Sequence, residues 1–474
     1  MGKTCYQGKH KVCPYREKMT WMRIHSIIFL LLALSAAPCL ADDVLSLTGR
    51  MNLRGVLPLH GDSATEYPSL TGRVKIDTPS ATWRFHAWLE GGWDGSVELP
   101  AKDHALLKKF DEVYQSNTPW LEFKELYLAF VKGDFELRAG VQRFAWGRLD
   151  EYPINDLLNP WDYSQFLRKP LEDRKIGIPS LSANLNLGDW SFDAVWAPFL
   201  VPYRLPLPGE RWSPDTVFSP LARTSYGDIV PAEPDLPART LGNGSFGLRL
   251  RHSGDIEWAL NLFHGYDPRP VFKTTALVVA PLPGKFLVDP GYVPDFHKIT
   301  SLGADAATVM GAWSLRGEIA FALNRRFNIR QELWGYPAIL QPGVYPLRPN
   351  QRSSDTLDYG IGADYRLAED VLLTVQAQQT VIFDRPDTLY DRTIETLLWF
   401  NVKAWWMNQK LETNLNLAWN PEHGDLMAKA DAWYVFTDAW KAGMTVVSFS
   451  GPAQSLFGRY AGNDQVEAEI VYSW

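Results

Sequence analysis

The segment from Asp464 to Trp474 reads DQVEAEIVYSW and forms the last eleven residues of the chain. Counted back from the end, every second residue is apolar or aromatic: Trp474, Tyr472, Ile470, Ala468 and Val466. The residues between them are mostly polar: Ser473, Val471, Glu469, Glu467 and Gln465. A period of two predicts a β-strand with one apolar face. Its length of roughly ten residues is what a tilted strand needs to cross a membrane.

The end of this strand resembles the terminal signal of bacterial outer-membrane β-barrels, which is a strand that finishes on an aromatic residue. In that class the last strand pairs with the first and is recognised by the barrel-insertion machinery. The resemblance therefore implies a barrel-closing role for Ile470, Tyr472 and Trp474, with outer-membrane lipid around them. The alternative is an edge strand of a soluble protein that happens to end in Trp. The other strands have to decide between the two.

A secretory leader precedes the first alternating segment. Arg23 is followed by an apolar run from Ile27 to Ala37, and Ala41 stands in front of two Asp residues. A basic flank, a short apolar core and a small residue are the parts of a signal peptide, and the run is too short for a spanning helix. We expect cleavage after Ala41, with residues 1–41 as leader and 42–474 as the barrel.

Charge and cysteine content narrow the function classes. The formal net charge of −7 becomes −12 after cleavage, because the leader holds six Lys or Arg residues and one Glu. An acidic chain argues against a general nucleic-acid-binding protein. The three cysteines, Cys5, Cys13 and Cys39, all lie in the leader, which excludes disulfides and cysteine-held metal clusters or haem from the mature chain. Cys39 would suggest a lipoprotein, but Pro38 fits a lipidation site poorly. We expect no cofactor.

The same alternation recurs along the chain, and short turns such as Gly133-Asp134 join neighbouring segments in pairs. Tight turns alternate with long excursions, as in outer-membrane barrels and unlike soluble β-sandwiches. The predicted fold class is all-β: a transmembrane antiparallel up-and-down β-barrel of about 16–18 strands. The predicted strands are 44–54, 70–77, 81–90, 122–131, 135–142, 181–187, 190–197, 246–252, 256–264, 302–310, 312–323, 359–366, 372–383, 396–406, 411–420, 425–436, 440–449 and 464–474. The predicted long loops are 56–66, 95–118, 148–179, 200–243, 266–299, 325–356 and 384–394.

Alternation also assigns the two faces of each strand. In 411–420 we expect Leu415 and Leu417 to meet lipid and Glu412 to face the lumen. In 425–436 the same parity points Lys429 and Asp431 inward. A Lys or Arg on the lipid face near the midplane costs roughly 2–4 kcal/mol, so the membrane enforces this parity.

A set of motifs lies between Phe123 and Pro160, namely Glu125 and Tyr127, then Leu137, Arg138, Gly140 and Gln142, then Trp146-Gly147 and Asn159-Pro160. With Leu315-Arg316-Gly317-Glu318, they resemble an uncharacterised porin-like outer-membrane family catalogued as a domain of unknown function. The resemblance implies a large barrel with an ill-defined transport role, for which hydrophobic compounds are suspected. The first strands and the proline-rich loop 200–243 depart from the family pattern and leave the solute open.

The third long loop, 148–179, concentrates charge. It carries Arg148, Asp150, Glu151, Asp156, Asp162, Arg168, Lys169, Glu172, Asp173, Arg174 and Lys175. In general porins the third long loop folds into the pore, where opposed charges set a transverse field that screens solutes. The alternative is a solvated surface loop whose charges pair locally.

Other inward positions are candidate pore-lining residues. They are Arg84, His86 and Glu90 on one strand, Glu125 on the next, and Arg138 and Gln142 beside Glu136 on the third. An Arg–Glu ladder here either stiffens the barrel wall or binds solute. Inward tryptophans would form an aromatic track for sugars or apolar solutes, unless they belong to rim belts: Trp88, Trp399, Trp405 and Trp433.

These observations favour a channel that passes small solutes across the outer membrane of a Gram-negative-type bacterium. H-E-x-x-H, G-x-S-x-G and P-loop motifs are absent, so no catalytic, cofactor or metal site is expected. The alternatives are a structural sheath around a partner such as an electron-transfer cytochrome, and a barrel-embedded hydrolase. The solute, which the resemblance suggests is hydrophobic or aromatic, is not determined by the sequence.

Overall fold

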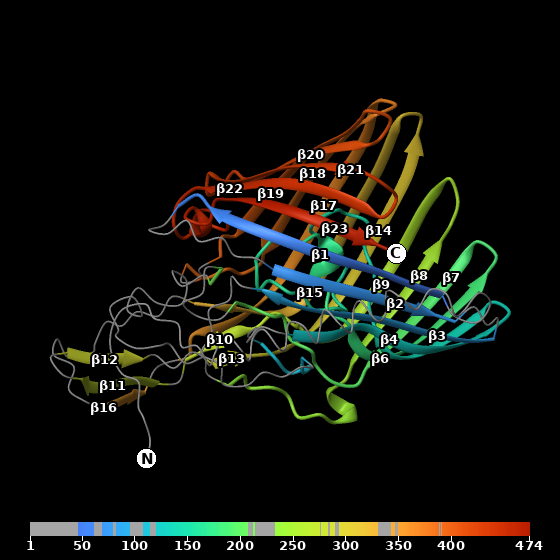
Figure 1. The fold of residues 1–474 in the computed structure, drawn as a ribbon. Helices are drawn as coiled ribbons and strands as arrows, with labels where there is room; N and C mark the ends of the chain where they lie inside the picture. The colour runs from blue at the N-terminus through green and yellow to red at the C-terminus, as the bar shows by residue number, and fades with distance from the viewer. Residues whose placement is uncertain are drawn as a thin grey trace, which may run out of the picture.

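Eighteen strands form one antiparallel sheet that closes on itself, so the predicted barrel is confirmed (Figure 1). The computed structural model describes residues 46–60, 69–78, 82–94, 108–113, 120–206, 212–213, 233–274, 276–282, 285–289, 293–329, 343–346, 349–387, 389 and 391–474. The expected leader, 1–41, lies outside these residues. The barrel strands are β1 (Ser46–Pro58), β2 (Ser69–Asp77), β3 (Trp83–Asp94), β4 (Trp120–Lys132), β5 (Phe135–Gln142), β6 (Ile178–Leu187), β7 (Trp190–Ala197), β8 (Ser245–His252), β9 (Ile256–Tyr266), β14 (Lys298–Met310), β15 (Trp313–Asn328), β17 (Gln351–Ala368), β18 (Val371–Ile382), β19 (Ile394–Trp406), β20 (Leu411–Asn420), β21 (Asp425–Val435), β22 (Trp440–Ser450) and β23 (Gln465–Ser473).

Two small sheets lie outside the barrel wall, on the side of the long loops (Figure 1). One pairs β10 (Val271–Lys273) with β13 (Val293–Asp295), and the other joins β11 (Ala276–Leu282), β12 (Lys285–Asp289) and β16 (Gly343–Pro346). In the part of the chain that the structure describes, the helical elements are α2 (Leu171–Arg174) and the 3₁₀ turns η3 (Leu241–Asn243) and η4 (Gly458–Tyr460). Within the described ranges, none of the helices has the length and apolar character needed to cross a membrane.

The strands β1 and β23 form the seam that closes the ring, as the terminal segment predicts. Their register pairs Met51 with Tyr472 and Leu53 with Ile470. Beyond them, Gly49 and Trp474 exchange two backbone hydrogen bonds of 3.0 Å. The Trp474 ring lies so close to Gly49 that a Cβ there would be 2.0 Å from a ring atom. Only glycine at this position lets the indole cover the seam.

Side chains alternate between lipid and lumen as expected. Leu415 and Trp419 on β20 are exposed on the outer face, whereas Asn416 and Ala418 between them are buried inside. Aromatic pairs on the outer face lie next to the short turns, as in the aromatic belts of membrane barrels: Trp190–Trp258, Trp313–Tyr365 and Trp440–Tyr472, with ring centroids 5.5, 4.5 and 4.8 Å apart.

At two β-bulges the alternation of inward and outward side chains changes parity, and the faces or strand ends expected from the sequence are wrong there. In β4 the pairing with β3 shifts between Trp88 and Leu89, so Lys124 and Glu125 both face the lumen side. In β15 the pairing shifts between Ala322 and Arg325, and Asn324 adopts φ +61. The predicted strand 312–323 stops at this bulge, although the structure carries β15 on to Asn328. The loop predicted as 325–356 is therefore shorter, spanning 329–350.

Candidate functional site

The connection between β5 and β6, residues 143–177, crosses the lumen; we call it the inserted loop. Its Arg148 binds Asp305 on β14 at 2.7 Å. Its Asp173 binds Arg73 on β2. In the ring of eighteen strands β14 lies halfway round from β1, and β2 follows β1. The third long loop is therefore inside the barrel and not on its surface.

Asn159 closes the neck of the inserted loop. Its Oδ1 accepts the backbone N–H of Phe144 at 2.6 Å, and its Nδ2 donates to the carbonyls of Gln142 and Ile176 at 3.0 and 2.8 Å. Gln142 is itself buried and donates to the carbonyl of Ser180 at 3.0 Å. Gln142 therefore points inward, as expected for a pore-lining residue, but it is covered at the neck and exposes no surface to a solute.

Glu318 on β15 holds the middle of the inserted loop. Its carboxylate accepts the backbone N–H groups of Arg148, Leu149, Ile154 and Asn155, the last three at 2.6, 2.8 and 2.9 Å. Gly147 and Glu318, which belong to two motifs far apart in sequence, thus meet inside the barrel.

Two apolar clusters fix the inserted loop on either side. Trp146, Leu158 and Ile176 pack against Val195, Phe263 and Ile299 of the wall. Phe166 and Leu167 pack against Trp399, Met427 and Phe449, with Tyr460 of the last long loop. The Phe166 and Tyr460 rings stack at 4.1 Å. At this level part of the lumen is filled by the chain's own side chains.

Ion pairs on the β9–β15 side of the inserted loop present carboxylates to the lumen. Asp150 pairs with Arg316, and the exposed fractions of their side chains are 53% and 9%. Glu257 pairs with Arg148 at 2.8 Å, with exposed fractions of 53% and 21%. In these two pairs the carboxylates are more accessible than the guanidinium groups. Arg251 on the neighbouring strand β8 is an exposed cation beside them, 44% exposed against 20% for its partner Asp193.

Ion pairs on the opposite side, along β1 and β2, present cations. Arg50 pairs with Asp173 at 3.7 Å, with exposed side-chain fractions of 31% and 14%. Lys169 pairs with Asp162 at 2.9 Å, and the exposed fractions of their side chains are 21% and 2%. A hollow of about 70 Å³ between the inserted loop and these strands is lined by Arg50, Arg54, Arg73, Arg168 and Lys169, among others. The loop thus separates a side with exposed carboxylates, the acidic side, from a side whose hollow is lined mainly by cations, the basic side. Glu172 is the exception on the basic side, because its carboxylate is 64% exposed beside Arg73.

Two fully buried carboxylates of the inserted loop, Asp162 and Asp156, have pKa values shifted in opposite directions. Burial alone would raise the pKa of Asp162, but attraction by Lys169, Lys108 and Arg204 lowers it well below the usual value. Burial raises the pKa of Asp156, against the opposing effect of Lys175. Asp156 is buried beside Lys175 and lines no accessible surface.

The other charges predicted in the inserted loop pair with the loop or the wall. Arg168 binds Glu467 on β23 at 3.3 Å, and Glu151 binds Arg174 within the loop. Glu172 lies 4.0 Å from Arg73. The local pairing that the sequence left open is therefore present, but it takes place inside the barrel.

The predicted Arg–Glu ladder on β3–β5 is an aromatic and ionic cluster. His86 lies between Asp77 at 2.5 Å and Glu125 at 3.0 Å, and Glu125 also accepts from Arg143 at 3.3 Å. Arg138 does not reach Glu125, and it binds Glu136 of its own strand at 2.9 Å.

Trp88 and Glu90 complete this cluster on β3. Three cations lie over the buried Trp88 ring, namely Lys75, Arg143 and Arg73 at 3.9, 4.0 and 4.7 Å. Glu90 is buried and accepts from Arg73 at 2.7 Å. Arg84, opposite Ala129, is exposed. The cluster joins β2, β3 and β4 to Arg143 at the start of the inserted loop.

The wall β19–β21 carries the remaining predicted residues. Trp405 and Trp433 both pair in register with Glu412, which binds Lys403 at 2.8 Å. Lys429 and Asp431 are partly buried on β21, and Asp431 accepts from Asn414 at 3.4 Å. Trp88 and Trp399 are buried, so of the four predicted track residues only Trp405 and Trp433 remain accessible to a solute.

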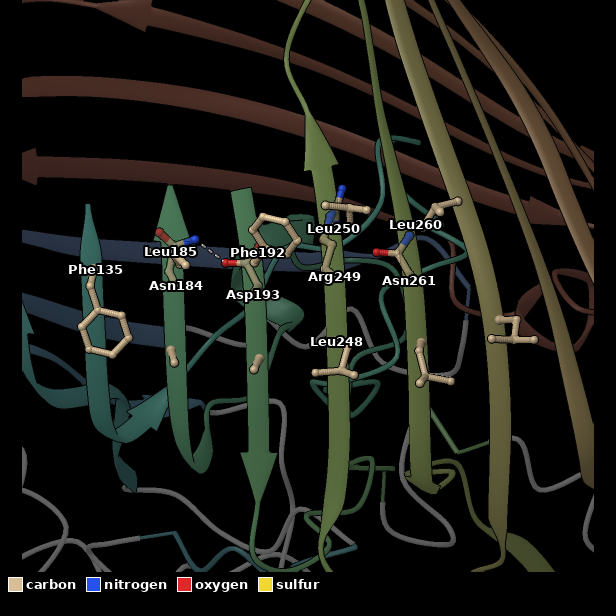
Figure 2. A pocket seen from close by; sticks show the side chains of 14 residues that line it. Phe135, Asn184, Leu185, Phe192, Asp193, Leu248, Arg249, Leu250, Leu260 and Asn261 are labelled. Carbon is tan, nitrogen blue, oxygen red and sulfur yellow. Dashed lines mark hydrogen bonds between the residues drawn. The ribbon is translucent and has the colours of Figure 1, made fainter. Parts of the chain in front are cut away.

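A larger hollow, of about 460 Å³, lies across β5–β9 and β14 (Figure 2). Its large apolar side chains, such as Phe192, Leu248 and Leu302, are exposed on the lipid-facing side of the wall. Asn184 and Asp193, joined by a hydrogen bond of 2.7 Å, alternate with these residues on β6 and β7. This hollow is therefore a shallow depression in the membrane-facing surface and not the functional site.

Glu318, Asp305 and Phe166 were not predicted as site residues. Glu318 appeared only as part of a motif, and no local pattern distinguishes Phe166 from other loop residues. Asp305 carries a detectable signal, because it is a charge within an otherwise apolar or small-residue strand, Gly303 to Ala307. Within the residues that the structure covers, no three His, Cys, Asp or Glu side chains gather in a way that could hold a metal ion.

The sequence profile of a family described as "Protein of unknown function (DUF1302)" matches residues 110–457. No curated protein matches the chain. Among solved structures, the chain is similar to OccAB4 of Acinetobacter baumannii, at 8% identity over 92% of this chain and 99% of that one, with a TM-score of 0.48. It is also similar to OccK8 (OprE) of Pseudomonas aeruginosa, at 9% identity over 91% and 99%, with a TM-score of 0.47. Similarity at this level concerns the porin-like fold alone.

Proposed function

The chain belongs to the DUF1302 family, whose function is unknown, and we propose that it is an outer-membrane channel for small solutes. The porin-like barrel implies an outer-membrane location. The observation that carries the proposal is the inserted loop, which crosses the lumen between an acidic side and a basic side. Export by a cleaved signal peptide and insertion through the terminal strand belong to the same proposal.

The charge separation supplies a physical basis for selectivity. Carboxylates at Asp150 and Glu257 lie on one side of the inserted loop, and cations at Arg50 and Lys169 lie on the other. Charges of opposite sign on opposite sides of the loop would set up a transverse field along the path of a solute. A small dipolar solute gains by aligning with this field, whereas a large or apolar solute must displace ordered water without compensation. The accessible inward groups are mostly charged or amide-bearing, which favours polar solutes over the hydrophobic ones suggested by the resemblance.

Recordings from the purified protein in planar bilayers test the proposal. We expect discrete conductance steps, and swelling of proteoliposomes by polar solutes that falls as solute size increases. Folded, heat-resistant barrels that conduct no ions and admit no solute would refute it.

The same preparations separate the alternatives. A sheath for an electron-transfer partner needs room for that partner, and the inserted loop occupies part of the lumen. A sheath would give no conductance until the inserted loop were removed. A hydrolase would cleave lipid or peptide substrates when pure, and we propose no catalytic role.

A further inference from the structure

Glu318 is a buried carboxylate whose acceptor positions are used by the inserted loop. Both oxygens take part: Oε1 accepts the N–H groups of Arg148 and Leu149, and Oε2 those of Ile154 and Asn155. The Asn155 side chain adds a fifth donor at 3.3 Å. Among the residues described, no Lys or Arg forms an ion pair with Glu318, so four backbone N–H groups and one side-chain amide stabilise its charge.

The inserted loop is shaped for this carboxylate. Gly147, just before the four donors, has φ +102, and a Cβ there would lie 2.9 Å from both carboxylate oxygens. A residue other than glycine would be strained and would collide with the anchor. Hydrogen bonds from N–H groups to a charged acceptor are roughly twice as strong as neutral ones. The loop conformation and the anion therefore stabilise each other.

The exposed charges of the acidic side follow directly from this anchor. Arg148, which binds Glu257 and Asp305, donates its own N–H to Glu318. Asp150 lies two residues further, with its N–H bonded to the Gln376 side chain at 2.9 Å. A shift of the anchored segment would therefore move the groups that face the solute, although Glu318 itself is covered.

We propose that Glu318 is the positioning residue that sets the ion selectivity of the channel, by fixing which loop charges face the lumen. This inference rests on the proposed function. The glutamate does not touch the solute, and it acts through the backbone of 148–155. Glutamine at this position keeps the shape but loses the charge, and it turns an NH₂ group toward donors that need an acceptor.

The first experiment measures the loop position without any transport assay. For this experiment Cys5, Cys13 and Cys39 of the full chain are replaced by Ser. Leu149→Cys then introduces a single thiol at a buried position. We expect maleimide to label this thiol roughly tenfold faster or more in Glu318→Gln, because losing one charged hydrogen bond shifts an equilibrium by about that factor. The matched control is Glu257→Gln, which removes an exposed partner of the same Arg148 and should change the labelling rate by less than about twofold.

The second experiment measures the reversal potential of the same variants in a salt gradient. We expect Glu318→Gln to change both conductance and ion selectivity, a change that loss of barrel stability alone would not produce. If Glu318→Gln does not fold, Gly147→Ala disturbs the same contact and should give both effects. Labelling and selectivity equal to the parent overturn the inference. Absence of conductance in every variant, with labelling still accelerated, counts against the channel and leaves the anchor standing.

Discussion

Phe166→Ala should release the far end of the inserted loop while leaving the barrel closed. Phe166 is buried in the cluster with Phe449, Phe457 and Tyr460, and its ring stacks on Tyr460 at 4.1 Å. Removing a buried Phe ring costs roughly 3–5 kcal/mol, because the transfer free energy is lost and a cavity remains. That cost falls on the contact between loop and wall, since the hydrogen bonds of the strands are unchanged.

The expected magnitude follows from this cost. Since about 1.4 kcal/mol corresponds to a factor of ten, opening of the loop tip should become a hundred- to several-thousand-fold more frequent. A thiol at the buried position Ser164, in the cysteine-free chain, reports this opening through its rate of maleimide labelling. Phe192→Ala removes a ring from the lipid face and serves as the control. Labelling in Phe166→Ala at the control rate would show that the loop is not held by this cluster.

Three further predictions concern charge. Asp150→Asn removes an accessible acid and should move the reversal potential toward anions by an amount that shrinks at high salt; an unchanged potential would contradict the acidic side. Leu415→Arg should destabilise the barrel by roughly 2–4 kcal/mol in urea unfolding from lipid, whereas Asn416→Arg, one residue along and facing inward, should cost less. Because the pKa of Asp162 is lowered on folding, its stabilisation is present at neutral pH and is lost only as pH falls below the usual value of 3.8. Cleavage of the loop tip by pepsin, a protease that works in acid, should become faster in that range, and Asp162→Asn should show faster maleimide labelling already at neutral pH.

The strands could be predicted because the membrane enforces their pattern. Segments such as Trp190–Ala197 and Leu411–Asn420 were predicted with the bounds that the structure shows, since each outward position must be apolar. The pattern failed at the bulge near Asn324, where one strand gains residues relative to its neighbour. A bulge is a local backbone event that leaves no periodic trace in the sequence.

The candidate site was predicted only in part. Charge density marked the inserted loop, but the partners of those charges lie far away in the chain: Arg168 binds Glu467, and Arg148 binds Asp305. Such pairings depend on which strands face each other across the lumen, and no local pattern encodes this. The sequence did not predict which of these residues are buried. Gln142 and Asp156 were predicted to line the pore, but both are buried and support the inserted loop.

The seam between β1 and β23 constrains the order of assembly. Residues Arg54 and Glu469, which meet across it, are 415 positions apart in the chain. Until β23 has been made and delivered, β1 keeps an unpaired edge, and any shorter product is an open trough with two such edges. Closure therefore requires that both edges be shielded from aggregation until the whole polypeptide is present.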